Sequence, residues 1–255
     1  MKNIIDLSIQ IVNFNTKSYL INCLQSVFQN LSDSQLSFEI NILDNNSNDD
    51  LSDLKSFFSD FQKESLKIYQ SQKNLGFGGG HNYLAKNTKA KYLLLLNPDI
   101  VIEEKESIER LYKRMIEESS IKVIGPKLYN KQGNNQAWDH GENKGLLVKV
   151  LNELGLGFWK NREQETECAW VSGAVFLIEK SVFDKINGFD ENFFLYKEEE
   201  DLCLRLKNLD RKYRVLYFPE VKIMHIGSVV AKKKIYFSTS NKYFLKKHPF
   251  GSRQA

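Results

Sequence analysis

The sequence contains too few cysteines to build a disulfide-stapled domain or a zinc site. Only three of its 255 residues are cysteine, and Cys23, Cys168 and Cys203 are too widely spaced for a CxxC pair or a zinc-ligand motif. Disulfide scaffolds depend on several paired cysteines within a short chain. We therefore expect a protein of a reducing compartment.

Long apolar runs and a strong net charge are also missing. No apolar run approaches the roughly 20 residues that a membrane-spanning helix needs, and the N-terminal residues do not form a signal segment. The formal net charge is +4, which is too small to indicate nucleic-acid binding unless the basic residues cluster. These absences favour a cytoplasmic protein.

The basic residues do cluster at the C-terminal end, where lysines alternate with Tyr and Phe from Lys232 to Lys247. Such a segment suits peripheral contact with the inner face of an anionic cell membrane. It suits equally a helix that packs its aromatic side chains on the domain. A nucleic-acid partner is not expected, because the basic residues are confined to this end. We expect a main domain at 1–228 and a basic, aromatic extension at 229–255.

What is present is the composition and periodicity of an α/β protein. With 42% hydrophobic and 12% aromatic residues, the chain can bury a full core. Alternating and helical apolar spacings follow one another along it. The predicted strands are 7–14, 38–43, 66–70, 92–96, 121–124, 168–178 with a break at Ser172 and Gly173, 213–218 and 221–225. The predicted helices are 17–29, 50–61, a short one after a glycine loop, 104–118, 181–186 and one ending near Leu209.

The most informative segment is the acidic run Glu198 to Asp201, which follows an apolar and aromatic stretch. Crowded carboxylates raise one another's pKa and repel unless cations or hydrogen-bond donors offset them. The run therefore indicates a functional site. The alternative is a plain helix N-terminus, where carboxylates interact favourably with the helix macrodipole.

Polar residues follow several predicted strands, at the edge of the sheet where open α/β folds bind ligands. Asp44 to Asp49 suits either a helix cap or a carboxylate that binds a ribose or base. Asn74 to Asn82 is either a flexible turn or a glycine-rich surface for a nucleotide sugar. Asn97 to Asp99 is either a turn or part of a cation site that bridges a diphosphate. His225 is a further nitrogen ligand or a structural histidine.

Taken in order, these segments resemble family-2 glycosyltransferases of the GT-A fold, particularly the bacterial rhamnosyltransferase-like members. The resemblance covers roughly residues 6–228. It rests on SIQIVNFN at 8–15, DNNSND at 44–49, NLGFGGGHN at 74–82, LLLNPD at 94–99, GPKLY at 125–129, WVSGAVFLI at 170–178 and GFDENFFLYKEEEDLCLR at 188–205. It implies an α/β fold with a Rossmann-like, mostly parallel central sheet flanked by helices.

The resemblance implies a pocket for a nucleoside-diphosphate sugar. Asp44 corresponds to the carboxylate that binds the base or ribose of the donor. The other positions implied to line this pocket are Asn13, Asn15, Asn46, Asn74, Gly76, Asn82, Asn97, Ser172 and Gly173.

The resemblance also implies a divalent cation, Mn²⁺ or Mg²⁺. Asp99 corresponds to the last residue of the family's metal-binding DxD motif, while Asn97 stands where many members have Asp. His225 resembles a histidine that helps to hold the cation in some relatives.

The family's general base is the second residue of a Glu-Asp pair. The corresponding position here is Glu199, with Glu198 and Asp201 supporting it or contacting acceptor or structure. Such a base takes the proton of the acceptor hydroxyl while the cation neutralises the departing diphosphate. A single in-line displacement of this kind inverts the anomeric configuration.

The expected function is therefore inverting glycosyl transfer in the synthesis of a bacterial surface polysaccharide. The favoured donor is dTDP-rhamnose, and the expected acceptor is a glycan or a polyprenyl-diphosphate-linked sugar. The alternatives are a UDP-sugar-dependent transferase and a non-catalytic domain that binds a nucleotide sugar or glycan. Nucleotide binding without transfer would identify the non-catalytic domain.

Overall fold

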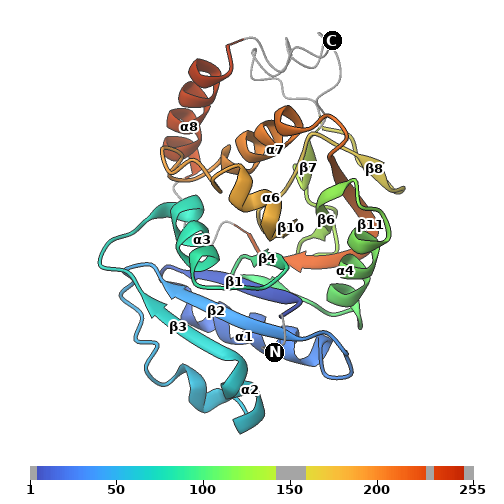
Figure 1. The fold of residues 1–255 in the computed structure, drawn as a ribbon. Helices are drawn as coiled ribbons and strands as arrows, with labels where there is room; N and C mark the ends of the chain where they lie inside the picture. The colour runs from blue at the N-terminus through green and yellow to red at the C-terminus, as the bar shows by residue number, and fades with distance from the viewer. Residues whose placement is uncertain (1–4, 142–158, 228–232, 250–255) are drawn as a thin grey trace.

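The computed structural model describes residues 5–141, 159–227 and 233–249, and nine strands within them form one mixed sheet (Figure 1). These strands are β1 (Leu7–Asn13), β2 (Phe38–Asp44), β3 (Leu66–Gln70), β4 (Tyr92–Leu96), β5 (Ile100–Val101), β6 (Ile121–Tyr129), β8 (Thr166–Glu167), β10 (Val175–Glu179) and β11 (Arg214–His225). Their spatial order is β3-β2-β1-β4-β10-β6-β11-β5, and β8 pairs with β11. A separate pair joins β7 (His140–Gly141) to β9 (Trp170–Val171).

The helices connect and cover these strands. They are α1 (Lys17–Asn30), α2 (Asp60–Ser65), α3 (Gly76–Lys86), α4 (Ser107–Glu117), α6 (Lys180–Lys185), α7 (Glu198–Leu209) and α8 (Lys233–Lys247), with a 3-10 helix η1 (Leu54–Phe57). In Figure 1, α8 lies beside α7 in the upper part of the view, above α3. No helix of the described ranges has the length and apolar character required to span a membrane.

The sheet is mixed but mostly parallel where the polar strand ends gather. β1 pairs in parallel with β2 and β4, and β2 pairs in parallel with β3. β10 is antiparallel to both of its neighbours, β4 and β6. The prediction of an α/β fold with a mostly parallel central sheet is confirmed.

β4 is buried on both of its faces. Leu94 and Leu96 belong to one core cluster, together with apolar residues of α1. Leu93 and Leu95 belong to a second cluster, together with residues of α6 and α7. Successive side chains of a strand point to opposite faces, so helices cover both sides of the sheet here. This double burial explains the uninterrupted apolar run of the strand.

The predicted helix at 50–61 is wrong. The structure has instead η1, an extended residue Phe58 and the short helix α2. Ser59 starts α2 with a capping box, because its hydroxyl accepts the Gln62 amide and the Gln62 side chain accepts the Ser59 amide. A strong N-cap inside an apolar pattern starts a new helix. Phe61, which the apolar spacing placed in that helix, is 80% exposed.

The predicted glycine loop is also wrong, because its glycines lie inside α3. Gly76 has a positive φ of 72° at the first turn, and a side chain there would collide with the carbonyl oxygen of Phe194. A Cβ atom on Gly78 would lie 2.8 Å from the Cβ of Phe189, and one on Gly80 would lie 2.8 Å from Val12 Cγ2. The glycines therefore allow α3 to approach β1 and the segment after α6 closely.

The two predicted late strands are one element. β11 runs through Pro219 and shifts its register against β6 between Phe218 and Lys222. Proline has no amide hydrogen to donate to a strand ladder, so an irregularity at this point lets the strand continue. The division into a domain at 1–228 and an extension at 229–255 stays a prediction.

Packing of α3 predicts a stability difference between two adjacent glycines. Gly78→Ala should lower the melting temperature, because overpacking costs about 1–3 kcal/mol and exceeds the gain of about 1 kcal/mol in helix propensity. Gly79→Ala is the matched control, since its Cβ would lie 3.1 Å from Leu75 Cβ, a tight contact that needs only a small shift, and its loss of stability should be smaller. Equal melting temperatures for the two variants would contradict this account of α3.

Candidate active site

The predicted polar residues of β1 and β2 lie side by side. Asn13 and Asp44 are register partners at the carboxyl ends of these strands. The Asn13 side chain donates to Asp49 Oδ2 over 3.1 Å, and the same oxygen accepts the first amide of α1 from Lys17 over 2.9 Å. Burial raises the pKa of Asp44, the Ser47 amide and Asn13 lower it, and the nearby Asp49 adds to the rise. The Asp44 to Asp49 segment thus presents a carboxylate and supports the start of α1 through Asp49, whereas the described residues near Asp50 do not form the helix that it was expected to cap.

Asn15 and Asn46 shape the turns beside this carboxylate. Their φ angles are 57° and 61°, a region that asparagine tolerates better than most residues. Asn15 accepts the Asn48 amide over 2.8 Å and the Ser47 hydroxyl over 3.2 Å. Their roles in holding the turns are evident, and their contact with a donor stays a prediction.

Asn45, which the sequence did not single out, joins the end of β2 to the start of α3. It donates to Asn74 Oδ1 over 3.0 Å and to the Gly76 carbonyl over 3.2 Å, and it accepts the Leu75 amide over 2.8 Å. Asn74 in turn accepts the Gly76 amide. Asn74 and Gly76 therefore lie next to the Asp44 turn, as a shared pocket requires.

Asn82 points elsewhere. It is buried and faces the segment after α6, where it accepts the Phe189 amide over 2.9 Å and donates to the Phe189 carbonyl and to Glu191. Both ends of its amide group are used in fastening α3 to that segment. Its predicted contact with the donor gains no support from this geometry.

Asp99, Asn97 and His225 meet at the carboxyl end of β4. His225 Nε2 lies 3.4 Å from Asp99 Oδ1 and 3.3 Å from the side-chain nitrogen of Asn97. Burial raises the pKa of Asp99, but His225 and the Gly227 amide outweigh it and hold the pKa below the usual value. The side-chain oxygen of Gln136 lies 2.9 Å from His225 Nδ1 and accepts its hydrogen, which fixes the orientation of the ring. The sequence around Gln136 has no readable periodicity, so it did not predict this contact with His225.

Glu198 and Glu199 form the first turn of α7 and lie close to the start of β10. Gly173 donates its amide to Glu199 Oε1 over 3.3 Å. The second carboxylate oxygen of each glutamate is buried and has no partner among the described residues. Burial raises the pKa of both, and Glu199 adds a further rise to the pKa of Glu198.

Gly173 brings the acidic turn next to the Asp99 cluster. A Cβ atom on it would lie 2.8 Å from the tip of the Phe77 ring, so a side chain here would require that ring to move. The following residue, Ala174, accepts the backbone amide of Asn97 over 2.9 Å. Ser172 accepts the Ala174 amide and shapes the same turn. A continuous chain of contacts therefore runs from Asp99 to Glu199.

A strained turn precedes the acidic residues. Tyr196 and Lys197 have φ angles of 71° and 73°, and a left-handed conformation costs about 1–2 kcal/mol for each non-glycine residue. Strain of this kind persists only where surrounding contacts fix it, and it is frequent at functional sites. The turn lets α7 begin with Glu199 directed toward Gly173.

Asp201 faces away from these glutamates. Its oxygens contact Arg205 Nε at 2.7 Å, Lys247 Nζ at 2.7 Å and His248 Nε2 at 2.8 Å. Burial raises the pKa of Asp201, but the hydrogen bonds from Lys247 and His248 and the charge of Arg205 outweigh it and hold the pKa below the usual value. Of the two roles that the sequence left open for Asp201, this geometry supports the contact with structure.

The aromatic residues of α8 also face the domain. Tyr236 lies against Phe194, Phe237 meets Tyr196 edge to face, and Tyr243 and Phe244 lie against Phe193. This arrangement supports the packed helix, the second of the two alternatives for the basic segment. Contact with a membrane stays a prediction.

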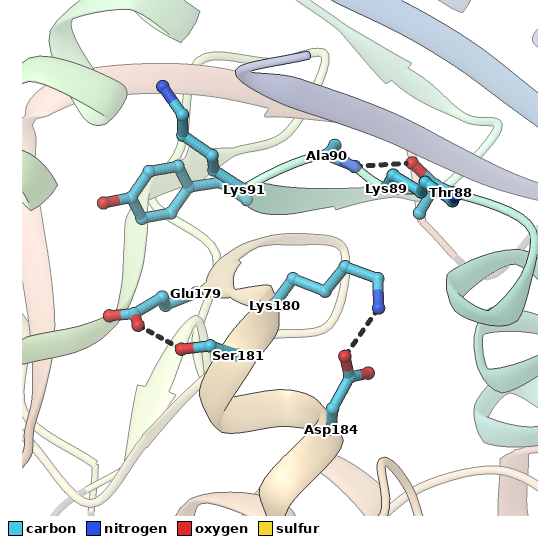
Figure 2. A pocket seen from close by; sticks show the side chains of 9 residues that line it. Thr88, Lys89, Ala90, Lys91, Glu179, Lys180, Ser181 and Asp184 are labelled. Carbon is cyan, nitrogen blue, oxygen red and sulfur yellow. Dashed lines mark hydrogen bonds and ion pairs between the residues drawn. The ribbon is translucent and has the colours of Figure 1, made fainter. Parts of the chain in front are cut away.

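A shallow pocket lies at the opposite edge of the sheet. Figure 2 shows Lys180 and Asp184 of α6 facing the segment Thr88 to Lys91, and the two α6 residues form an ion pair at 2.6 Å. The pocket borders Tyr92 at the start of β4, whereas the Asp99 cluster follows the end of that strand. Besides this pair, Lys91 binds Asp6 and Glu179 binds Lys122, and the pocket holds none of the predicted site residues.

Carboxylates gathered at the carboxyl ends of parallel strands are typical of ligand-binding α/β enzymes, and comparison with known proteins defines the class. The family model for glycosyl transferase family 2 matches residues 8–187. The chain belongs to this family and is a family-2 glycosyltransferase with the GT-A fold.

Individual relatives agree with this assignment. Rhamnosyltransferase WbbL of Escherichia coli K12 is 24% identical over 237 residues, which are 88% of this chain and 85% of the relative. The low-salt glycan biosynthesis hexosyltransferase Agl10 of Haloferax volcanii is 28% identical over 79% of this chain and 62% of its own length. The solved mannosyltransferase PcManGT of Pyrobaculum calidifontis, in complex with GDP-Man and Mn²⁺, shares the fold with a TM-score of 0.66 at 10% identity. That match covers 97% of this chain and 64% of the solved one.

Burial of Glu198 predicts that removing its charge stabilises the fold. A carboxyl group with a raised pKa in the folded state destabilises that state above the ordinary Glu pKa of 4.5, where the unfolded chain ionises first. Glu198→Gln should therefore raise the melting temperature at pH 7 to 8, and the gain should shrink as the pH falls toward 4.5.

Glu200→Gln is the matched control for this measurement. It removes the same charge two residues further along the helix. Because Glu200 is paired with Lys197 at 2.6 Å, we expect no gain in melting temperature. If Glu198→Gln lowered the melting temperature at neutral pH, the assignment of a destabilising buried charge would be wrong.

Proposed function

We propose that the chain transfers a sugar, with inversion, from a nucleoside diphosphate to a hydroxyl group of a glycan or polyprenyl-diphosphate-linked acceptor. The product is a bacterial surface glycan. The names of the two relatives, a rhamnosyltransferase and a glycan-biosynthesis hexosyltransferase, support this class of pathway. The first name supports rhamnose as the transferred sugar, and we take dTDP-rhamnose as the favoured donor, with a UDP-sugar as the alternative.

The observation that carries the proposal is the state of the Glu199 carboxylate. One oxygen accepts the Gly173 amide, which fixes the orientation of the group, and the other is buried without a described partner. A raised pKa brings this carboxyl closer to the operating pH, where a general base works best. Both features suit a base that waits for a substrate hydroxyl.

The proposed reaction is a single displacement at the anomeric carbon of the donor sugar. Glu199 takes the proton of the acceptor hydroxyl as its oxygen attacks the anomeric carbon of the donor sugar. The bond from that carbon to the diphosphate oxygen breaks on the opposite face, and the diphosphate leaves with the electron pair. Attack and departure on opposite faces need no covalent intermediate and invert the configuration, as in inverting glycosidases.

Asp44 and its neighbours are proposed to bind the nucleoside part of the donor. The Asp44 carboxylate lies beside Asn13 at the ends of β1 and β2, and Asn45 holds the Asn74 to Gly76 turn next to it. A carboxylate here can accept hydrogen bonds from ribose hydroxyls or a base. The complex of the similar solved structure with GDP-Man supports a nucleotide sugar as the ligand.

Asp99 and His225 are proposed to hold a divalent cation, Mn²⁺ or Mg²⁺. The residues fit such an ion, since the Asp99 carboxylate and His225 Nε2, both atoms of ligand type, lie 3.4 Å apart and a cation could bind to both. No group of three or more His, Cys, Asp or Glu side chains gathers in the described parts of the chain. Two protein ligands are sufficient where substrate phosphates and water complete the coordination. When bound, the cation supplies charge neutralisation for the departing diphosphate.

The base assignment predicts a selective loss of turnover. Glu199→Gln preserves the shape of the side chain but removes the base, so turnover should fall by roughly 10² to 10⁴ with nucleotide affinity unchanged. In the wild type, activity should be lost as the pH falls through a midpoint above 4.5, the ordinary Glu value, because the base is then protonated.

The assignment of Asp44 to the donor pocket predicts the opposite pattern. Asp44→Ala should weaken nucleotide binding in a protein that still folds.

Variants of the neighbouring glutamates test whether Glu199, rather than one of them, is the base. Glu200→Gln should remain active, because Glu200 is directed to Lys197. An active Glu199→Gln beside an inactive Glu198→Gln with intact nucleotide binding would identify Glu198 as the base instead. If the wild type binds the nucleotide but neither transfers nor hydrolyses the donor sugar, the alternative of a non-catalytic nucleotide-sugar-binding domain would be favoured.

The cation assignment predicts dependence on divalent metal. Chelation should abolish transfer, readdition of Mn²⁺ or Mg²⁺ should restore it, and Asp99→Ala should behave like the chelated wild type. The measurement is transfer rate against free metal concentration for both proteins. Full activity of the wild type in excess EDTA would remove the cation from the mechanism.

A further inference from the structure

Helix α8 and the segment that leads into the acidic turn are joined by contacts of several kinds. Both lie beyond residues 8–187, the part matched by the family model. The contacts involve the backbone before the strained turn, the side chain of the turn itself and the carboxylates on either side of it.

The backbone contact comes directly before the strained turn. Ser240, 4% exposed, donates its hydroxyl to the carbonyl of Leu195 over 2.8 Å. The next two residues, Tyr196 and Lys197, are those with left-handed backbone conformations. The hydrogen bond therefore fixes one end of the segment that needs external support.

The side chain of Lys197 is held by aromatic rings of α8. Its ammonium group lies 5.6 Å from the ring centre of Phe237 and 5.4 Å from that of Phe244, distances typical of cation–π contacts. It also pairs with Glu200 at 2.6 Å. Lys197 is thus bound both to α8 and to the first turn of α7.

Lys247 connects the two ends of the segment. Its ammonium group lies 2.7 Å from Asp190 Oδ2 and 2.7 Å from Asp201 Oδ1. Tyr243 donates to Asp190 over 3.0 Å, and His248 contacts Asp201 at 2.8 Å. Asp201 is fully buried, so its ion pair with Lys247 is shielded from solvent.

We propose that α8 is a positioning brace for the catalytic base. It holds the Tyr196–Lys197 turn in its strained conformation and thereby keeps Glu199 against Gly173. The proposal rests on the proposed function of Glu199. α8 acts through Leu195, Lys197 and Asp201, and no contact joins it to Glu199 among those described, so its loss should affect proton transfer and spare donor binding.

The test compares three full-length variants. Lys247→Met keeps much of the aliphatic stem but breaks both ion pairs, Lys247→Arg keeps the charge, and Lys246→Met removes the same charge from an exposed neighbour on the same helix. We expect Lys247→Met to lower kcat by about 10- to 100-fold, as misplacement of a catalytic group does, with the donor KM unchanged. Lys247→Arg should restore most of kcat, and Lys246→Met should match the wild type.

Amide hydrogen exchange at residues 195–201 supplies a second readout that does not depend on transfer. Exchange should be faster there in Lys247→Met and unchanged in Lys246→Met. Ser240→Ala, which removes one hydrogen bond, should give a smaller change of the same kind and serves if Lys247→Met does not fold.

Two results would overturn the brace. One is a kcat for Lys247→Met equal to that of Lys246→Met, and the other is a parallel change in kcat and donor KM that tracks the melting temperature. A wild type without transfer activity would refute the proposed function instead. In that case amide hydrogen exchange alone would test the brace. Equal exchange rates at residues 195–201 in Lys247→Met and Lys246→Met would refute it.

Discussion

The antiparallel direction of β10 is the constraint on which the site depends. β10 lies between β4 and β6 and runs opposite to both. Its beginning therefore lies at the carboxyl end of β4, where Ala174 accepts the Asn97 amide. A parallel strand in this place would put Gly173 at the other edge of the sheet, beside the pocket of Figure 2. Because the strand is reversed, Gly173 can join the acidic turn of α7 to the Asp99 cluster.

Carboxylates around this junction divide into two groups with opposite electrostatics. Asp190 and Asp201 are surrounded by Lys247 and other donors, which outweigh burial and hold their pKa values below the ordinary range. Glu198 is buried and Glu199 is half-buried, neither forms an ion pair with a described residue, and burial raises the pKa values of both. The first group stabilises the fold at neutral pH and the second destabilises it. A site that needs a base in a desolvated position carries such a cost, and the paired aspartates hold the segment in place despite it.

The sequence predicted most of the sheet because doubly buried strands such as β4 have uninterrupted apolar runs. It also predicted that Asp99 and His225 would share a strand edge, since both follow apolar strands. It failed at 50–61, where the cap at Ser59 overrides the apolar spacing, and at the glycines, whose purpose is close packing of α3 on residues distant in sequence. Asn45 and Gln136 were missed because a hydrogen bond between distant residues leaves no periodic signal. The anchoring of Asp201 by α8 was missed for the same reason.

The acidic run posed a choice between a helix N-terminus and a functional site, and the structure shows that the two are compatible. α7 begins at Glu198, so the macrodipole does act on these carboxylates. Its contribution is about 0.3–1 kcal/mol at exposed positions and up to about 2 kcal/mol in partly buried ones. That is too little to compensate Glu198 and Glu199, because their pKa values remain raised and each has an oxygen without a described partner. Glu200, one position further, is partnered by Lys197. The helix terminus explains where the carboxylates are, and the unpaired oxygens distinguish the two that are available for chemistry.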